Sequence, residues 1–204
     1  LWRAAPTYRA EAKLRIGEPP PTAGVGAGSI LGFMRMGGDP FANDLELLNS
    51  RTVTEAIVRD AALTARLHAP RGWHRDSIFQ SITTTDHTKR AMFSLEWIAP
   101  KQIEVRQLGD DGEKIGTFTA GTPATFGGIT VVFREKRGDW PDDIRLSTVS
   151  FGEAVKRPST RVTVERRRRD ANVASVTTQD MDPALAKLIV STALDRFIGL
   201  VVIA

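Results

Sequence analysis

A strict alternation of apolar and charged side chains near the start of the chain limits its fold more than any other feature. Between Tyr8 and Ile16 the sequence reads YRAEAKLRI, with an apolar residue at every second position and charged residues between them. Successive side chains of a strand point to opposite faces, so this period of two predicts a strand with one buried and one solvated face. Turn-forming residues from Gly17 to Pro21 end it.

Strand-like and helix-like spacings organise the rest of the chain. Alternating apolar residues predict strands at 91–97, 103–105, 115–118, 129–133, 145–150, 162–169 and 173–177, several of them consecutive strands of a meander. A short helical turn follows Asn43, and Thr52–Glu55 has the form of a capping box that opens a helix to about Leu67. A short helix is predicted at 151–157, and Asp182-Pro183 predicts the start of the last helix. Together, these strands and helices predict an α+β fold, with a mostly antiparallel or mixed sheet and helices packed on one face.

Length and composition indicate one folded domain. The chain has 204 residues, 41% hydrophobic and 25% charged, which is typical of a globular protein. We expect a single domain over 1–204, with a flexible Gly/Pro-rich loop at about 17–29 and a meander insertion at about 90–135. The chain opens on Leu1 without an initiator methionine, so we interpret it as a processed product or an excised fragment. No stretch approaches the roughly 20 apolar residues of a membrane helix, the longest candidate being 197–204.

The positive charge of the chain is concentrated in one region. The formal net charge is +4, yet positions 156–169 alone hold seven of the 28 Lys and Arg residues beside a single acid, Glu165. The remainder of the chain is therefore slightly acidic. Cysteine is absent, which excludes disulfides, thiolate metal sites and cysteine nucleophiles but leaves the compartment open.

The run Arg166, Arg167, Arg168 and Arg169 is the feature with most chemical weight. On a strand Arg166 and Arg168 would lie on one face and Arg167 and Arg169 on the other, so at most half form one patch. One interpretation is an edge strand or hairpin tip protected by charge. The other is contact with an anionic partner: an acidic glycan, lipid headgroups or carboxylates of a neighbouring subunit. Nucleic acid is disfavoured, since no stacking aromatic residues interleave with the cations.

Other motifs point to no catalytic, cofactor or metal site. Gly24–Gly28 follows three prolines and lacks the strand that a dinucleotide fingerprint requires, so it is interpreted as a flexible loop. The spacing of the three histidines fits no helical or finger-like ligand set, which favours surface or capping roles. Ser81, Asp86 and His87 could be drawn as a hydrolase triad, but no nucleophile elbow is present. The two acid pairs belong to turns. The histidines are His68, His74 and His87, and the acid pairs are Asp110-Asp111 and Asp142-Asp143.

In the order of its segments the chain resembles the periplasmic domain of the chain-length determinant family. These are the Wzz-type polysaccharide copolymerases, which include exopolysaccharide transport proteins and the outer portion of bacterial tyrosine kinases. Tyr8–Ile16 looks like the family's first strand, and Asp44–Val53 with the following helix is similar to its helical segment. Val173–Val176 followed by Asp182–Leu194 looks like its last base-domain strand and the next helix. The turn at 111–113 and Thr125–Gly128 fit in order, so the resemblance spans roughly 8–198.

The resemblance implies a non-enzymatic domain of a membrane-anchored, homo-oligomeric inner-membrane protein. Such a domain would lie in the periplasm and govern the chain length or export of a surface polysaccharide, together with other assembly and export proteins. It implies no cofactor and no catalytic residue. The family's membrane helices, long coiled coil and proline-rich stretch are missing here, as expected of an excised base domain. The alternative is a basic glycan- or lipid-contacting module without an assembly role.

Overall fold

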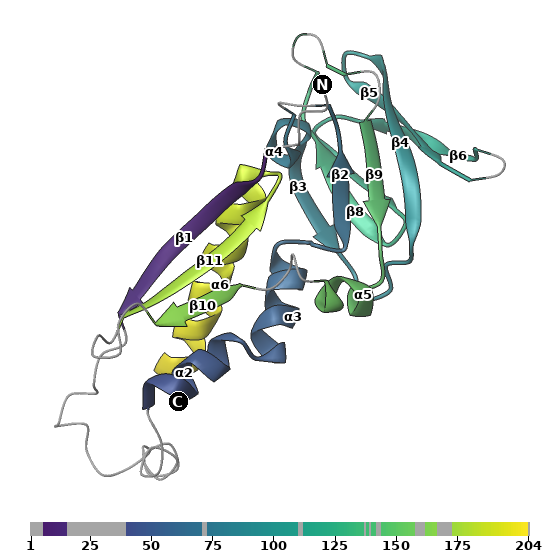
Figure 1. Cartoon of the computed structure of the whole chain (residues 1–204). Helices are drawn as coiled ribbons and strands as arrows, with labels where there is room; N and C mark the ends of the chain where they lie inside the picture. Colours follow the sequence, from purple (N-terminus) through teal and green to yellow (C-terminus); the bar gives the residue numbers. More distant parts are fainter. Residues whose placement is uncertain are drawn as a thin grey trace, which may run out of the picture.

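The computed structural model describes residues 6–15, 40–70, 73–109, 112–136, 138, 140–141, 144–157, 162–166 and 173–203. These residues form an α+β structure with three antiparallel sheets, which confirms the predicted fold class. Two hydrophobic cores lie side by side: one beneath a three-stranded sheet with its helices, the other inside a unit built almost entirely of strands (Figure 1). We call these two parts the sheet–helix unit and the β-unit.

The sheet–helix unit joins the beginning of the described chain to its end. Strand β1 (Tyr8–Arg15) pairs antiparallel with β11 (Val173–Asp180), which also pairs with β10 (Thr163–Arg166), in the order β1-β11-β10. Ala10, Ala12 and Leu14 pack against the core of this unit, and the charged residues between them lie on the opposite face. The predicted half-buried strand is confirmed, and its period of two decides which face the helices cover.

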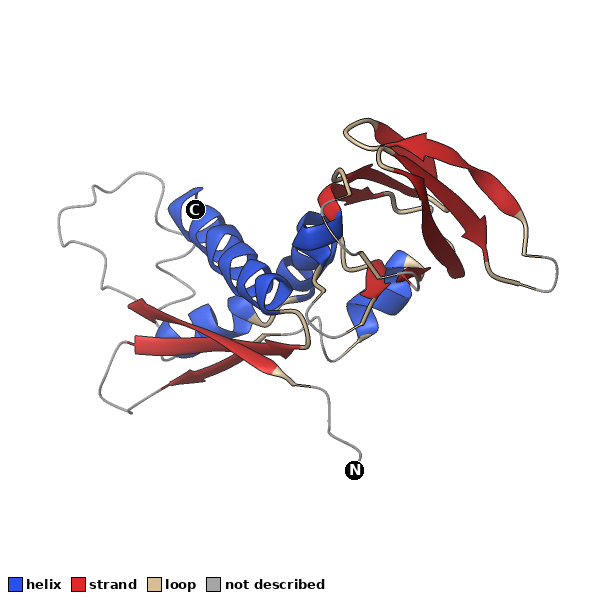
Figure 2. Cartoon of the chain, turned by 90° about the horizontal axis from the view of Figure 1, so that it is seen from above, coloured by secondary structure: helices blue, strands red, loops and turns tan. Residues whose placement is uncertain are grey.

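Helix α6 (Pro183–Ile203) packs on that face of the sheet, and α2 (Pro40–Leu48) and α3 (Arg51–Asp60) pack against α6 (Figure 2). Helix α6 begins as predicted, because Asp182 Oδ1 accepts hydrogen bonds from the backbone N–H groups of Ala184 and Leu185 at 2.9 and 3.3 Å. Within the described residues, no helix has the length and apolar character needed to cross a membrane.

Helix α3 differs from its prediction at both ends. Its N-cap is Ser50, whose hydroxyl accepts from the Val53 N–H at 3.3 Å, and not Thr52. It ends at Asp60 instead of about Leu67, because Ala62 adopts a φ of 46° and the Leu63 N–H returns to the Val58 carbonyl at 2.9 Å. This is a Schellman-type closure, which stops a helix irrespective of the apolar residues that follow.

The β-unit contains a five-stranded and a three-stranded sheet. The larger sheet has the order β2-β9-β4-β5-β6, and the smaller one the order β3-β8-β7. The bounds are β2 (Ala65–His68), β3 (Phe79–Thr84), β4 (Ala91–Ala99), β5 (Gln102–Gln107), β6 (Lys114–Thr119), β7 (Pro123–Phe126), β8 (Ile129–Phe133) and β9 (Ile144–Thr148). Strands β4, β5 and β6 form the predicted meander, whereas β2, β3 and β7 were not predicted from the sequence.

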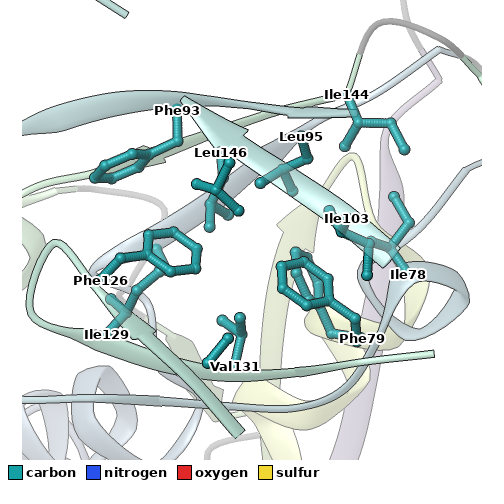
Figure 3. Packing of buried hydrophobic residues seen from close by; sticks show 14 of the residues in the cluster. Ile78, Phe79, Phe93, Leu95, Ile103, Phe126, Ile129, Val131, Ile144 and Leu146 are labelled. Atoms are coloured by element: carbon teal, nitrogen blue, oxygen red, sulfur yellow. The ribbon is translucent and has the colours of Figure 1, made fainter. Parts of the chain in front are cut away.

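Large apolar side chains from both sheets fill the space between them. Phe93, Leu95 and Leu146 from the larger sheet face Phe126, Ile129 and Val131 from the smaller one (Figure 3). Phe93 and Phe126 meet edge to face, with ring centroids 5.0 Å apart. Because β2 and β9 belong to the larger sheet, the β-structure reaches well beyond the predicted insertion at 90–135.

Two short helices lie where the two units contact each other. Helix α4 (Arg75–Ile78) leads into β3, and α5 (Phe151–Lys156) follows β9. The predicted helix at 151–157 is confirmed, and its N-terminus is a capping box in which Ser150 and Glu153 exchange hydrogen bonds.

Candidate functional site

The structure describes one residue of the arginine run. Arg166 is the last residue of β10, lies opposite Ala174 and is half-buried on the same face as Val164. Strand β10 is an edge strand, as the charge-protection interpretation expects. Arg167, Arg168 and Arg169 lie outside the described residues, so contact of the run with an anionic partner stays a prediction.

The three histidines occupy separate places. His68 is on β2, His74 precedes α4, and His87 is exposed in the turn between β3 and β4. The described part of the chain brings no three His, Cys, Asp or Glu side chains together as metal ligands. Gly24–Gly28 and the two acid pairs lie outside the described residues.

The hydrolase triad drawn from the sequence does not assemble. Asp86 Oδ1 lies 3.6 Å from a guanidinium nitrogen of Arg59, which is an ion pair with α3. In the described part of the chain no hydrogen bond joins Ser81, Asp86 and His87. His87 is exposed, which agrees with the surface role that the sequence favoured for the histidines.

A concave feature of the described residues lies where the two units meet. It is a cavity of roughly 700 Å³ between the open edge of β2, the beginning of β1 and the first turns of α6. Leu67, Trp73, Met181 and Leu185 contribute apolar surface to it. A volume of this size falls within the range of about 300–1,000 Å³ that is usual for small-molecule sites.

One wall of this cavity is built around Asp182. Besides capping α6, Asp182 accepts a hydrogen bond from the Arg75 N–H through Oδ2 at 2.9 Å, and its Oδ1 lies 3.9 Å from His74 Nδ1. The Arg75 guanidinium donates to the Ala61 carbonyl at 2.7 Å. Burial lowers the pKa of Arg75 to about 10, against the charges of Asp182 and Asp76. The hydrogen bonds of Asp182 link α4 to α6, and that of the Arg75 guanidinium links α4 to the end of α3.

The opposite wall is cationic. Arg66 and His68 on β2 pair with Ser147 and Arg145 on β9, so these four side chains share the outer face of the larger sheet. Arg157, at the end of α5, completes the wall. His68 Nε2 and Ser147 Oγ are 2.8 Å apart. Burial, followed by repulsion from Arg66, Arg145 and Arg157, lowers the pKa of His68, which keeps its imidazole neutral at neutral pH.

The charges around the Ser147–His68 pair oppose proton abstraction. If His68 took the hydroxyl proton, an imidazolium would form beside three guanidinium groups, and such repulsion is costly in a partly buried site. Among the described residues, no carboxylate makes a hydrogen bond to His68 to offset that charge.

Sequence reasoning missed this wall because the helix predicted to about Leu67 included Arg66 and ended next to His68. The available signal was their i, i+2 spacing, which matches that of Arg145 and Ser147, but the pairing of the two segments is a property of the fold.

Comparisons with known proteins give no identity. No protein-family model matches the chain, and no curated protein matches it. Two solved structures of Xanthomonas campestris FlgL, in space groups H3 and C2, overlap with it at TM-scores of 0.34 and 0.34, with 13% and 12% sequence identity. The overlaps cover 67% and 69% of this chain and 44% and 46% of FlgL, so the chain spans less than half of that protein's length. Likeness at this level supports no statement about fold or function.

Proposed function

We propose that the chain is a non-enzymatic periplasmic domain of a membrane-anchored polysaccharide copolymerase. It acts in controlling the chain length, or in the export, of a surface polysaccharide. The protein works as a homo-oligomer with other polysaccharide assembly and export proteins, and the domain needs no cofactor.

One observation carries this proposal. The segments that resemble the chain-length determinant family pack around one hydrophobic core. Strand β1, helices α2 and α3, strand β11 and helix α6 come from distant parts of the sequence, yet they pack into one sheet–helix unit. The β-unit is inserted between them in the sequence. Segments that resemble a family in their order, and that also form one contiguous unit, support a base domain of that family carrying a large insertion.

Deletion of the gene in its host, followed by complementation, tests the function. We expect the deletion to change the length distribution or the exported amount of a surface polysaccharide, measured by gel electrophoresis and sugar analysis. Val176→Asp, at a fully buried position of β11, should fail to restore it, and Gln179→Asp, at an exposed position of the same strand, should restore it. Unchanged polysaccharide in the deletion strain would rule the proposal out.

The encoding gene provides a second test. A membrane-anchored parent requires an apolar span of about 20 residues shortly before Leu1. A parent sequence without such a span would count against membrane anchoring.

A further inference from the structure

We propose that a groove along α4 and the start of β3 binds a segment of polysaccharide. One sugar ring lies on Trp73, and sugar hydroxyls bind the side chains of Asp76, Ser77 and Gln80. The inference goes beyond the proposed function, because control of chain length or export does not by itself require this domain to touch the glycan. It rests on the shape of the groove and on the side chains that line it.

The groove consists of two hollows that adjoin along α4 and β3, whose places Figure 1 shows. The first has a volume of roughly 540 Å³ and lies between α4 and the segments that follow β6 and β8. The second, of roughly 480 Å³, lies between β3 and the first turns of α6. Asp76 and Gln80 line both hollows, so together these form one elongated depression. A depression of that form suits a linear ligand.

Trp73 provides an aromatic platform at one end of the groove. Its ring packs on the buried Trp140 with centroids 5.5 Å apart, and Trp140 in turn meets Trp97 edge to face at 4.8 Å. These contacts hold Trp73 in place, while the residue stays partly exposed in the groove. A pyranose ring has an apolar face of C–H groups, which packs on such an aromatic ring while the hydroxyls point outward from its edge.

The polar side chains next to this platform are available to a ligand. Among the described residues, no hydrogen bond or ion pair engages the side chains of Asp76, Ser77 and Gln80. Asp76 and Gln80 are exposed, and Ser77 is half-buried. A carboxylate, a hydroxyl and an amide together offer both acceptors and donors. Sugar hydroxyls, which donate and accept, match this mixed set, and a neutral sugar makes no demand on the charge of the groove.

Gln80 owes its place to an irregularity of β3. The register of β3 against β8 shifts between Phe79 and Ser81, so Gln80 is an extra residue and forms a β-bulge. A bulge re-aims a side chain and interrupts the hydrogen-bonding pattern of its strand. Because β3 is an edge strand of the smaller sheet, the bulge also disfavours the addition of a peptide strand at this end of β3. The backbone here therefore favours a saccharide over an extended peptide.

Two oligosaccharides serve as probes: cellotetraose, which is neutral, and tetrasaccharides released from the surface polysaccharide of the host. Binding to the full chain is followed by NMR through the indole N–H signals of the tryptophans. We expect at least one probe to shift the Trp73 signal saturably at millimolar concentration. The Trp97 signal should move much less, because Trp97 lies outside the described lining of the groove. A monosaccharide should bind more weakly, and a capped tetraserine peptide should give no saturable shift.

Variants of two lining residues locate the glycan. Trp73→Ala removes the platform and Gln80→Ala removes an exposed amide, and each should weaken oligosaccharide binding by about fivefold or more. Trp73→Phe keeps an aromatic ring and should bind with an intermediate affinity, which separates loss of stacking from loss of fold. Gln107→Ala is the matched control for Gln80→Ala, because Gln107 is exposed on β5 outside the described lining. Its affinity should equal that of the wild type.

Three results would overturn the inference. The first is no saturable shift of the Trp73 signal by either oligosaccharide. The second is equal affinity for the tetraserine peptide, which would make a peptide the occupant. The third is unchanged binding by folded Trp73→Ala and Gln80→Ala, which would place the glycan elsewhere. The proposed function fails separately: oligosaccharide binding together with an unchanged polysaccharide in the deletion strain would support the groove and rule out a role in chain length or export.

Discussion

At the scale of single residues, the turn between β7 and β8 depends on two glycines. Gly127 and Gly128 have φ values of 58° and 79°, the pair of positive angles that a two-residue hairpin turn requires. A Cβ on Gly128 would lie 2.7 Å from the backbone Cα of Thr88. Thr88 cannot move away freely, because its hydroxyl donates to the Gly128 carbonyl at 2.9 Å.

Gly128→Ala and Gly152→Ala should therefore change stability in opposite directions. We expect Gly128→Ala to lower the free energy of unfolding by more than about 1 kcal/mol, through strain and steric overlap. Gly152 lies within α5 with open space around its Cα, so Gly152→Ala should raise stability by roughly 0.5–1 kcal/mol. Urea denaturation of both variants measures the difference, and equal effects would contradict this account of the turn.

At the scale of elements, the two faces of β1 make different contributions. Ala12 packs toward the core beneath the sheet, whereas Lys13 points away from it. Ala12→Gln should destabilise the protein by about 1–3 kcal/mol, because a longer polar side chain is forced toward α6. Lys13→Gln, the neighbouring change, should stay within about 0.5 kcal/mol. Thermal denaturation checks the pair, and a larger effect at Lys13 would reverse the assigned faces.

The β5–β6 hairpin is held by an ion-pair cluster on its outer face. Glu104 accepts hydrogen bonds from Lys114 Nζ and Arg106 Nε, each at 2.6 Å, and its side chain is 11% exposed. The hydrogen bonds from Lys114 and then Arg106 lower the pKa of Glu104. A carboxyl with a lower pKa in the folded state adds stability above its unfolded pKa, and this is lost as pH falls through the folded pKa.

Lys114→Gln should raise the pKa of Glu104 toward its ordinary value. The stability that Glu104 adds above its unfolded pKa should then shrink, and the fall in stability with acid should be shallower than in the wild type, because the folded and unfolded pKa values lie closer together. The control is Lys101→Gln at the turn between β4 and β5, since Lys101 pairs with Glu135 at 3.0 Å. Carbon-detected NMR titration of the Glu104 carboxyl gives the pKa directly. If Lys114→Gln and Lys101→Gln had the same effect, the cluster would not be the cause.

Elements with a clear period were predictable, and those that depend on distant partners were not. Strands β1, β4 and β8 alternate cleanly, and α6 carries an Asp-Pro start, so their own residues specify them. Strand β2 has only four residues and follows directly on a helical stretch, so its identity comes from its pairing with β9. The candidate cavity follows the same rule, because its cationic wall exists only once β2 and β9 are side by side.

At the scale of the whole molecule, Asp182 joins the two units. Its carboxylate caps α6 in one unit and accepts from the first residue of α4, which leads into the other. Asp182→Ala removes both contacts and should lower the free energy of unfolding by about 1–3 kcal/mol. Asp182→Asn keeps an oxygen acceptor for the cap and should fall between Asp182→Ala and the wild type.

Asp195→Ala is the matched control on the same helix, because Asp195 is exposed. It should change stability by no more than about 0.5 kcal/mol. Amide hydrogen exchange tells where the loss occurs, and we expect faster exchange in the first turns of α6 and in α4 for Asp182→Ala. Equal destabilisation by Asp182→Ala and Asp195→Ala would show that the contacts of Asp182 do not link the two units.

The pairing of β1 with β11 also fixes an order of events during synthesis. Tyr8 ends up opposite Asp180 and Arg15 opposite Val173, so β1 leaves the ribosome long before its partner exists. The β-unit, whose strands lie between Ala65 and Thr148, can be completed in that interval. Meanwhile Ala10, Ala12 and Leu14 have no covering layer, and the charges that alternate with them keep the waiting segment from pairing with other nascent chains. The pattern that gives β1 its two faces in the finished protein also protects it before that protein is complete.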